Sequence, residues 1–170
     1  MDNNRSHSFE ISMTRVFNAP RELVFKAWTE IDHFAKWWGP QGVALEIVKM
    51  DAQSGGGFLG IQTSPDGNQV MWTKFVYQEV VEPERVTYIR SFSDEQGNTV
   101  RSPFTMSWPL EIMNSISLED DEGNTVLKLK GYPVNALAEE QETYKVAATR
   151  LQQDLESTFD RLANYLALLI

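Results

Sequence analysis

The C-terminal segment of the chain repeats its apolar side chains at the spacing of an α-helix. Steps of three and four residues between positions 144 and 169 follow the 3.6-residue turn and make one stripe. Asn135 has the short polar side chain that can cap the start of such a helix. A helix over 136–169 would be about 50 Å long, which predicts a bend or break near 138–144. The stripe, which needs an equally long apolar surface to cover it, consists of Tyr144, Ala148, Leu151, Leu155, Phe159, Leu162, Leu166 and Leu169.

The segments before this helix read as strands that can supply that surface. The first, HSFEISMTRVF, alternates apolar Phe9, Ile11 and Met13 with polar neighbours, as a half-buried strand does. About six further runs are separated by turn-forming Gly, Asp-Gly and Pro segments, which favour antiparallel hairpins. The pattern predicts an α+β fold. We expect one domain over residues 1–170, with a curved antiparallel sheet of about six to seven strands wrapped around the long C-terminal helix.

Two short helices are predicted directly after the first strand. Pro20 suits the first turn of one helix, because its missing N–H would be unpaired there in any case. Thr29 is expected to cap the second helix, which would run to Trp38 and stop at Gly39-Pro40.

The composition limits the class of partner. The chain has 24 acidic and 15 basic residues, a formal net charge of −9, and no cysteine. An acidic surface disfavours nucleic acids and anionic lipids, and the lack of cysteine excludes disulfides and thiolate chemistry. No segment reads as a signal peptide or a membrane span. We expect a cytoplasmic monomer or homodimer that binds neither nucleic acid nor membrane, with residues 1–7 disordered.

Six segments, spread in order over nearly the whole chain, carry a family resemblance. They are RVFNAPRELVFKAWTE, KWWGPQG, MDAQSGGGFLG, VYQEVVEPERVTYI, GYPV and STFDRLANYL. Together they resemble the SRPBCC or START-like superfamily, and within it the branch named after the activator of the Hsp-90 ATPase. The resemblance implies the helix-grip fold, in which the sheet wraps around the C-terminal helix and leaves an internal cavity. That superfamily includes binders of apolar small molecules, cyclase-like enzymes and a co-chaperone domain.

One departure from the family pattern bears on the cavity. The family usually has Gly-Trp shortly before its Leu-Asp-Arg-Leu stretch, whereas this chain has Asp154-Leu155 before FDRL. Loss of the indole predicts a cavity that is larger, differently shaped, or refilled by Phe159 and Trp72. Asp154 also introduces a carboxylate at this position.

The adjacent Trp37 and Trp38 are candidates for the cavity wall. Neighbouring residues on a helix point about 100° apart, so the two indoles cannot share one face. We expect one in the core and the other at the cavity mouth or the surface, where it can contact a ligand. The alternative is that both serve only to pack the hydrophobic core.

Strand alternation and the helix stripe supply the remaining candidates. Phe75 and Tyr77 lie on the more apolar face of the run 70–80, which we expect to point inward. Arg90 lies among aromatic residues in TYIRSF, where it can hold a ligand carboxylate or lie at the surface with its stem on those rings. The candidate ligand-binding residues are Trp37, Trp38, Phe75, Tyr77, Arg90, Met106, Trp108, Tyr144, Leu151, Leu155 and Phe159.

No pattern indicates catalysis, a metal or a cofactor. The SGGG run at 54–57 lacks the Lys and Ser/Thr of a phosphate loop, and we interpret it as a tight turn or bulge. A hydrolytic triad or a metal site would depend on His33 alone. We therefore predict no catalytic residue, no metal ligand and no cofactor.

Three functions are compatible with these features. The leading hypothesis is non-catalytic binding of a small, mostly apolar or aromatic ligand in an internal cavity between the sheet and the C-terminal helix. The alternatives are a co-chaperone-like protein-interaction domain and, third, a cyclase- or hydrolase-type enzyme. The enzyme hypothesis requires a buried acid or base in the cavity, for which Asp154 and Glu111 are the acids to inspect.

Overall fold

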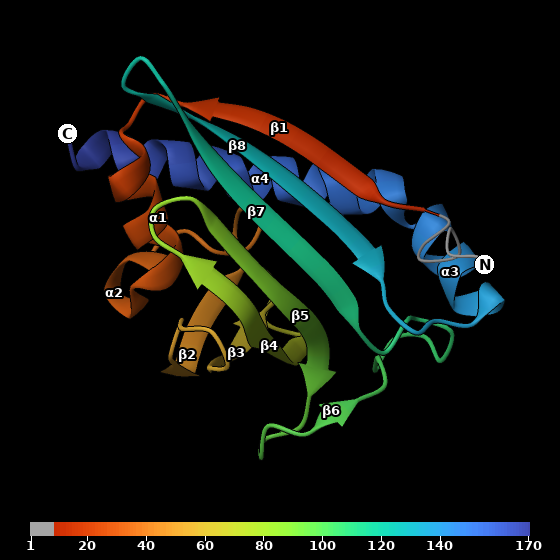
Figure 1. Cartoon of the computed structure of the whole chain (residues 1–170). Helices are drawn as coiled ribbons and strands as arrows, with labels where there is room; N and C mark the ends of the chain where they lie inside the picture. The colour runs from red at the N-terminus through yellow and green to blue at the C-terminus, as the bar shows by residue number, and fades with distance from the viewer. Residues whose placement is uncertain (1–8) are drawn as a thin grey trace.

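The computed structural model describes residues 9–170 as an open, eight-stranded antiparallel sheet with four helices (Figure 1). The predicted disorder of residues 1–7 lies outside the described residues. The elements in chain order are β1 Ile11–Phe17, α1 Arg21–Thr29, α2 Ile31–Phe34, β2 Ala44–Met50, β3 Gly57–Thr63, β4 Val70–Val81, β5 Arg85–Ser93, β6 Thr99–Val100, β7 Ile112–Asp121, β8 Asn124–Pro133, α3 Ala138–Val146 and α4 Ala148–Leu168.

The sheet has the order β1-β8-β7-β5-β4-β3-β2, which confirms the predicted antiparallel α+β architecture. The first strand, β1, pairs with the last, β8, which directly precedes the C-terminal helices. The two-residue β6 lies in the segment between β5 and β7, and it pairs with β5. Register shifts after Ile47 in β2 and after Tyr77 in β4 mark bulges, which increase the twist and bend of a sheet.

The long C-terminal helix runs along one face of this sheet, behind β1, β7 and β8 in Figure 1. The expected break in the helix occurs at Ala147, between α3 and α4, and not within 138–144. Asn135 is not the N-cap that the sequence predicts, because its backbone has a φ of 53° in the left-handed region. Leu137 precedes α3 instead, and its N–H donates to the Glu140 carboxylate at 3.0 Å.

The two short helices differ from the prediction in their caps and lengths. Thr29 is the last residue of α1, and its Oγ1 donates to the Phe25 carbonyl at 2.8 Å. Its hydroxyl therefore satisfies a carbonyl of its own helix, and Glu30 takes the N-cap position of α2. The second helix ends at Phe34, so Trp37 and Trp38 lie in the turns that follow it.

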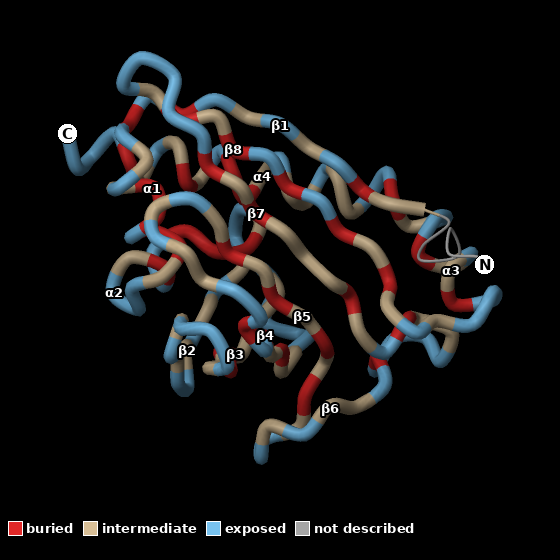
Figure 2. Tube along the Cα trace, in the orientation of Figure 1, coloured by how far each residue is buried: buried red, intermediate tan, exposed pale blue. Residues whose placement is uncertain are grey.

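Buried residues, which Figure 2 draws in red, occur along the whole sheet and the helices. The apolar ones form two clusters toward opposite ends of α4. The larger cluster fills the space between α1, the turns after α2 and the C-terminal half of α4; we call it the main core. It is rich in aromatic rings, among them Phe17, Trp28 and Phe159. The smaller cluster beneath α3, here the α3 core, consists of Ile11, Ile112, Tyr144 and Ala148.

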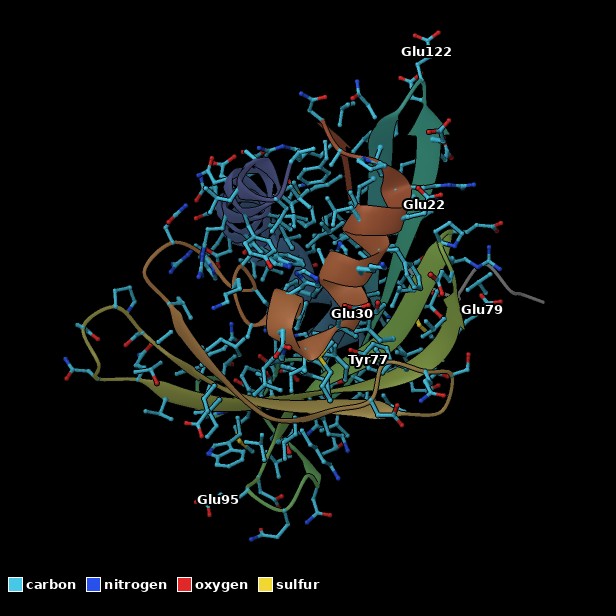
Figure 3. All side chains as sticks on the ribbon, turned by 90° about the vertical axis from the view of Figure 1, so that its left-hand side faces the viewer. Glu22, Glu30, Tyr77, Glu79, Glu95 and Glu122 are labelled. Atoms are coloured by element: carbon cyan, nitrogen blue, oxygen red, sulfur yellow. The ribbon has the colours of Figure 1, made fainter. Side chains whose placement is uncertain are left out.

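The acidic side chains lie mainly outside these cores. Figure 3 shows Tyr77 directed into the interior, whereas Glu79, Glu95 and Glu122 lie at the periphery. Burial raises the pKa of the Tyr77 hydroxyl well above its usual range, so the phenol is neutral at physiological pH. The alternation of β4 therefore directs its apolar face inward, as the sequence predicts, and leaves charge at the surface.

Replacing Phe159 should reveal how strongly α4 depends on the main core. Phe159 is fully buried, with its ring 6.0 Å from Phe17 and 6.3 Å from Trp28. We expect Phe159→Ala to lower the free energy of unfolding by about 3–5 kcal/mol. The matched control is Leu168→Ala on the same helix, whose side chain is 81% exposed. Urea unfolding followed by circular dichroism should separate the variants, and equal losses would contradict this account of the core.

Candidate ligand cavity

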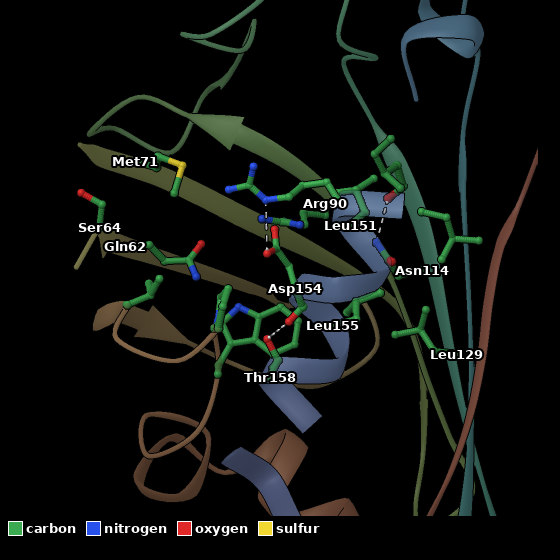
Figure 4. Close-up of a pocket in the computed structure, with 18 of the residues that line it drawn as sticks. Gln62, Ser64, Met71, Arg90, Asn114, Leu129, Leu151, Asp154, Leu155 and Thr158 are labelled. Carbon is green, nitrogen blue, oxygen red and sulfur yellow. Dashed lines mark hydrogen bonds and ion pairs between the residues drawn. The ribbon is translucent and has the colours of Figure 1, made fainter. Parts of the chain in front are cut away.

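A cavity of about 690 Å³ lies between the sheet and α4, between the main core and the α3 core. Strands β5, β7 and β8 provide one wall, and the N-terminal half of α4 provides the opposite wall (Figure 4). The turns after α2 and the β3–β4 hairpin complete it. The α4 wall consists of Arg150, Leu151, Asp154, Leu155 and Thr158.

Gly131 on β8 allows α3 to approach the sheet closely at one end of the cavity. The Tyr144 hydroxyl donates to the Gly131 carbonyl at 2.9 Å. A Cβ at position 131 would lie 3.0 Å from Asn114 Oδ1 and 3.1 Å from the Tyr144 hydroxyl. A side chain at this position would crowd both groups, so glycine suits this close approach, and Tyr144 lines the cavity at this end.

The Trp-Trp-Gly-Pro segment forms another part of the wall, and its two indoles diverge. The Trp37 Nε1–H donates to the Ala27 carbonyl at 3.0 Å within the main core. Trp38 is also buried but lines the cavity. Gly39 follows with a φ of 105°, a conformation that glycine adopts without steric cost.

Helix α4 holds this segment in place through its side chains. Nη1 of Arg161 donates to the carbonyls of Gly39, Pro40 and Val43 at 2.9, 3.1 and 3.3 Å. The N–H of Gln41 donates to the Ser157 hydroxyl at 2.9 Å. Burial lowers the pKa of Arg161, yet its carbonyl partners favour the charged guanidinium.

Arg90 is the positive group on the sheet side of the cavity. Burial lowers the pKa of its guanidinium, and the effect is opposed by Tyr88, Tyr144 and Asp154. Burial also raises the pKa of the Tyr88 and Tyr144 hydroxyls well above the usual range, so both phenols are neutral at physiological pH. Asp154 faces this region from α4, as Figure 4 shows, and its carboxylate lies 3.6 Å from Nε of Arg150.

The family model for the Activator of Hsp90 ATPase homolog 1-like proteins matches residues 18–167. The chain belongs to this family. Comparison with curated protein sequences gave no match.

Several solved structures have the same fold as this chain. A protein from Arthrobacter aurescens superposes with a TM-score of 0.78 at 18% identity, over 98% of this chain and 90% of its own. The AHSA1 protein from Silicibacter pomeroyi gives 0.73 at 18% identity, over 95% and 100%. A protein from Mycobacterium smegmatis gives 0.72 at 21% identity, over 95% and 90%. These likenesses show the fold that the sequence predicts.

The AHSA1-like fold brings together six of the eleven candidate residues in the cavity wall. They are Trp38, Arg90, Trp108, Tyr144, Leu151 and Leu155. Four others pack in the main core and do not line the cavity: Trp37, Phe75, Tyr77 and Phe159. The strand face of Phe75 and Tyr77 and the helix stripe of Phe159 do point inward, but other aromatic side chains fill the interior there. Met106 is 79% exposed and does not line the cavity either.

The departure from the family's Gly-Trp pair falls in the cavity wall itself. Both Asp154 and Leu155 line the cavity. Phe159 packs in the main core, and Trp72 is not among the lining residues. Neither aromatic residue therefore takes the place of the missing indole.

Several polar lining residues were missed by the sequence analysis. Gln62 is 5% exposed in β3, and Asn114 lies in β7 on the same alternation as Ile112 and Ile116. That alternation is the signal that would have identified Asn114 as inward-facing. Thr158, three residues after Leu155 on α4, is found in the same way from helical spacing.

Features outside the cavity have structural roles. His33 Nδ1 lies 2.6 Å from the Tyr165 hydroxyl, which joins α2 to α4. In the glycine run, Gly55 has a φ of 86° in the turn between β2 and β3. Within residues 9–170, no group of three or more His, Cys, Asp or Glu side chains is placed to hold a metal. None of the helices in that range has both the length and the apolar character needed to cross a membrane.

Removing the Arg161 guanidinium should loosen the Trp-Trp-Gly-Pro segment. Charge-assisted hydrogen bonds are worth about 1.5–3 kcal/mol, so we expect Arg161→Met to lower the free energy of unfolding by that amount. It should also speed hydrogen exchange of the Gln41 amide. The control is Arg150→Met on the same helix, whose side chain is 80% exposed and whose i,i+4 pair is worth only about 0.5 kcal/mol. If the two variants lose equal stability and the Gln41 amide stays protected, Arg161 does not hold this segment.

Proposed function

We propose that the protein binds a small, mostly apolar ligand in the cavity between the sheet and α4, without catalysing a reaction. The cavity volume carries this proposal, because about 690 Å³ lies within the range of about 300–1,000 Å³ typical of ligand pockets. The lining also has the expected character. Aromatic and aliphatic side chains make up the larger part of the lining, and nine polar or charged side chains are available to orient a ligand.

Apolar burial would supply most of the binding free energy. Covering about 200 Å² of apolar ligand surface contributes roughly 5 kcal/mol, before the entropic cost of association is subtracted. The two apolar clusters on either side give the cavity rigid walls, so little ordering is needed when the ligand enters. Trp38 and Trp108 present indole surface to the ligand.

Leu155 gives the sharpest test of the cavity. The family usually has tryptophan at this point, so Leu155→Trp restores an indole that the fold accepts elsewhere and fills the space. We expect the wild-type protein to bind the neutral fluorophore N-phenyl-1-naphthylamine saturably. In Leu155→Trp the affinity should fall at least tenfold, equivalent to about 1.4 kcal/mol, as measured by the fluorescence of the bound dye.

Leu168→Trp is the matched control, because it adds the same indole at an exposed position of the same helix. It should bind the dye as the wild type does. Thermal unfolding of both variants shows whether overpacking has lowered stability. Equal dye affinity in the wild type and Leu155→Trp, or no saturable binding in the wild type, contradicts the proposal.

A co-chaperone-like role is the second candidate, and the description of the matching family favours it. Such a role predicts that the purified protein stimulates the ATPase of purified Hsp90 in a saturable manner. A steady-state ATPase titration measures this directly. An unchanged rate over a wide range of protein concentration excludes this function and leaves the ligand proposal intact.

A further inference from the structure

We propose that the ligand is an amphipathic monoanion, and that its carboxylate pairs with Arg90 inside the cavity. This inference rests on the proposed function and adds the chemical class of the ligand. Its basis is the placement of one unpartnered guanidinium in a cavity that otherwise offers mainly apolar and neutral polar groups.

Arg90 has no hydrogen-bonding or ion-pair partner among residues 9–170. Its guanidinium carries five N–H donors in a planar fork, the geometry that matches a carboxylate. Arg90 is half-buried, and a charge that has lost part of its water without gaining a partner is costly. A ligand carboxylate would supply the missing acceptors. The desolvation of the Arg90 guanidinium, which is unfavourable without a ligand, would then be offset by hydrogen bonds to the carboxylate.

The charges around the cavity also favour an anion. The charged lining residues are Arg90, Arg150 and Asp154, which sum to +1 within a chain of net charge −9. Asp154 has a second cationic neighbour, since Nε of Arg150 lies 3.6 Å from its carboxylate. The cavity therefore has a local charge opposite in sign to that of the whole chain, and one net positive charge matches a monoanion.

Three groups interact electrostatically with Arg90, and Asp154 is the one carboxylate among them. Tyr88 and Tyr144 interact with it electrostatically, and burial keeps both phenols protonated. Ile112, Leu129 and Leu151 line the same cavity and offer apolar surface to the rest of the ligand. An acid with a hydrocarbon or aromatic body satisfies both parts of this lining at once.

Matched probe pairs separate the contribution of charge from that of shape. We would compare decanoate with decan-1-ol, and 2-naphthoate with 2-naphthylmethanol, by isothermal titration calorimetry at pH 7.5. Within each pair the apolar body is the same and only the head group changes. We expect each acid to bind at least tenfold more tightly than its alcohol.

Two cavity variants should move this preference in opposite directions. Arg90→Met keeps the length of the side chain and removes its charge, so the acid should lose its advantage while the alcohol binds as before. Asp154→Asn removes the one carboxylate of the lining, so the acid should bind more tightly relative to the alcohol. Arg85→Met is the control, because Arg85 lies on the same strand but outside the cavity, paired with Glu79 at 2.8 Å.

The possible outcomes are distinct. If acid and alcohol bind equally well to the wild type, or if Arg90→Met retains the preference, this inference is wrong while the proposed apolar cavity stands. If no member of either pair binds, both this inference and the proposed function are overturned. A loss of preference in Arg90→Met and not in Arg85→Met supports the pairing.

Discussion

Leu155 packs against both apolar clusters, so a single turn of α4 joins the two parts of the interior. The C-terminal half of the helix is fixed by the main core, and its first turn packs in the α3 core. Between them the helix crosses the sheet without filling the space beneath it. The cavity therefore results from how α4 is held at its two ends, and every lining residue depends on that placement.

The backbone segments of the cavity wall also depend on the position of the helices. Arg161 and Ser157 project from α4 to the backbone that follows Trp38, and Tyr144 reaches the Gly131 carbonyl from α3. These bonds join segments far apart in the sequence, so the cavity wall forms only when the helices have docked. Arg101 adds to this frame by pairing at 2.7 Å with the buried Glu140 of α3.

The sequence predicts the architecture well because periodicity reports which face of an element is buried. It identified the inward face of β4 and placed Leu151 and Leu155 on the buried stripe of α4. Periodicity does not identify the side chains that an inward-facing residue will contact. Phe75 and Tyr77 meet other aromatic rings, whereas Asn114, on an equally inward face, lines the cavity. Thr29 and Asn135 were misassigned as caps because backbone geometry outweighed their local propensity.

The rim of the cavity is built differently from its walls. Pro65, Gln69 and Phe104 line the mouth from loops that are exposed and belong to neither apolar cluster. Substitutions there change the opening with little effect on folding, since surface loops tolerate sequence change. The shape of the opening can therefore change independently of the scaffold. Proteins that share this fold at about 20% identity are accordingly expected to differ more at this rim than in the two apolar clusters.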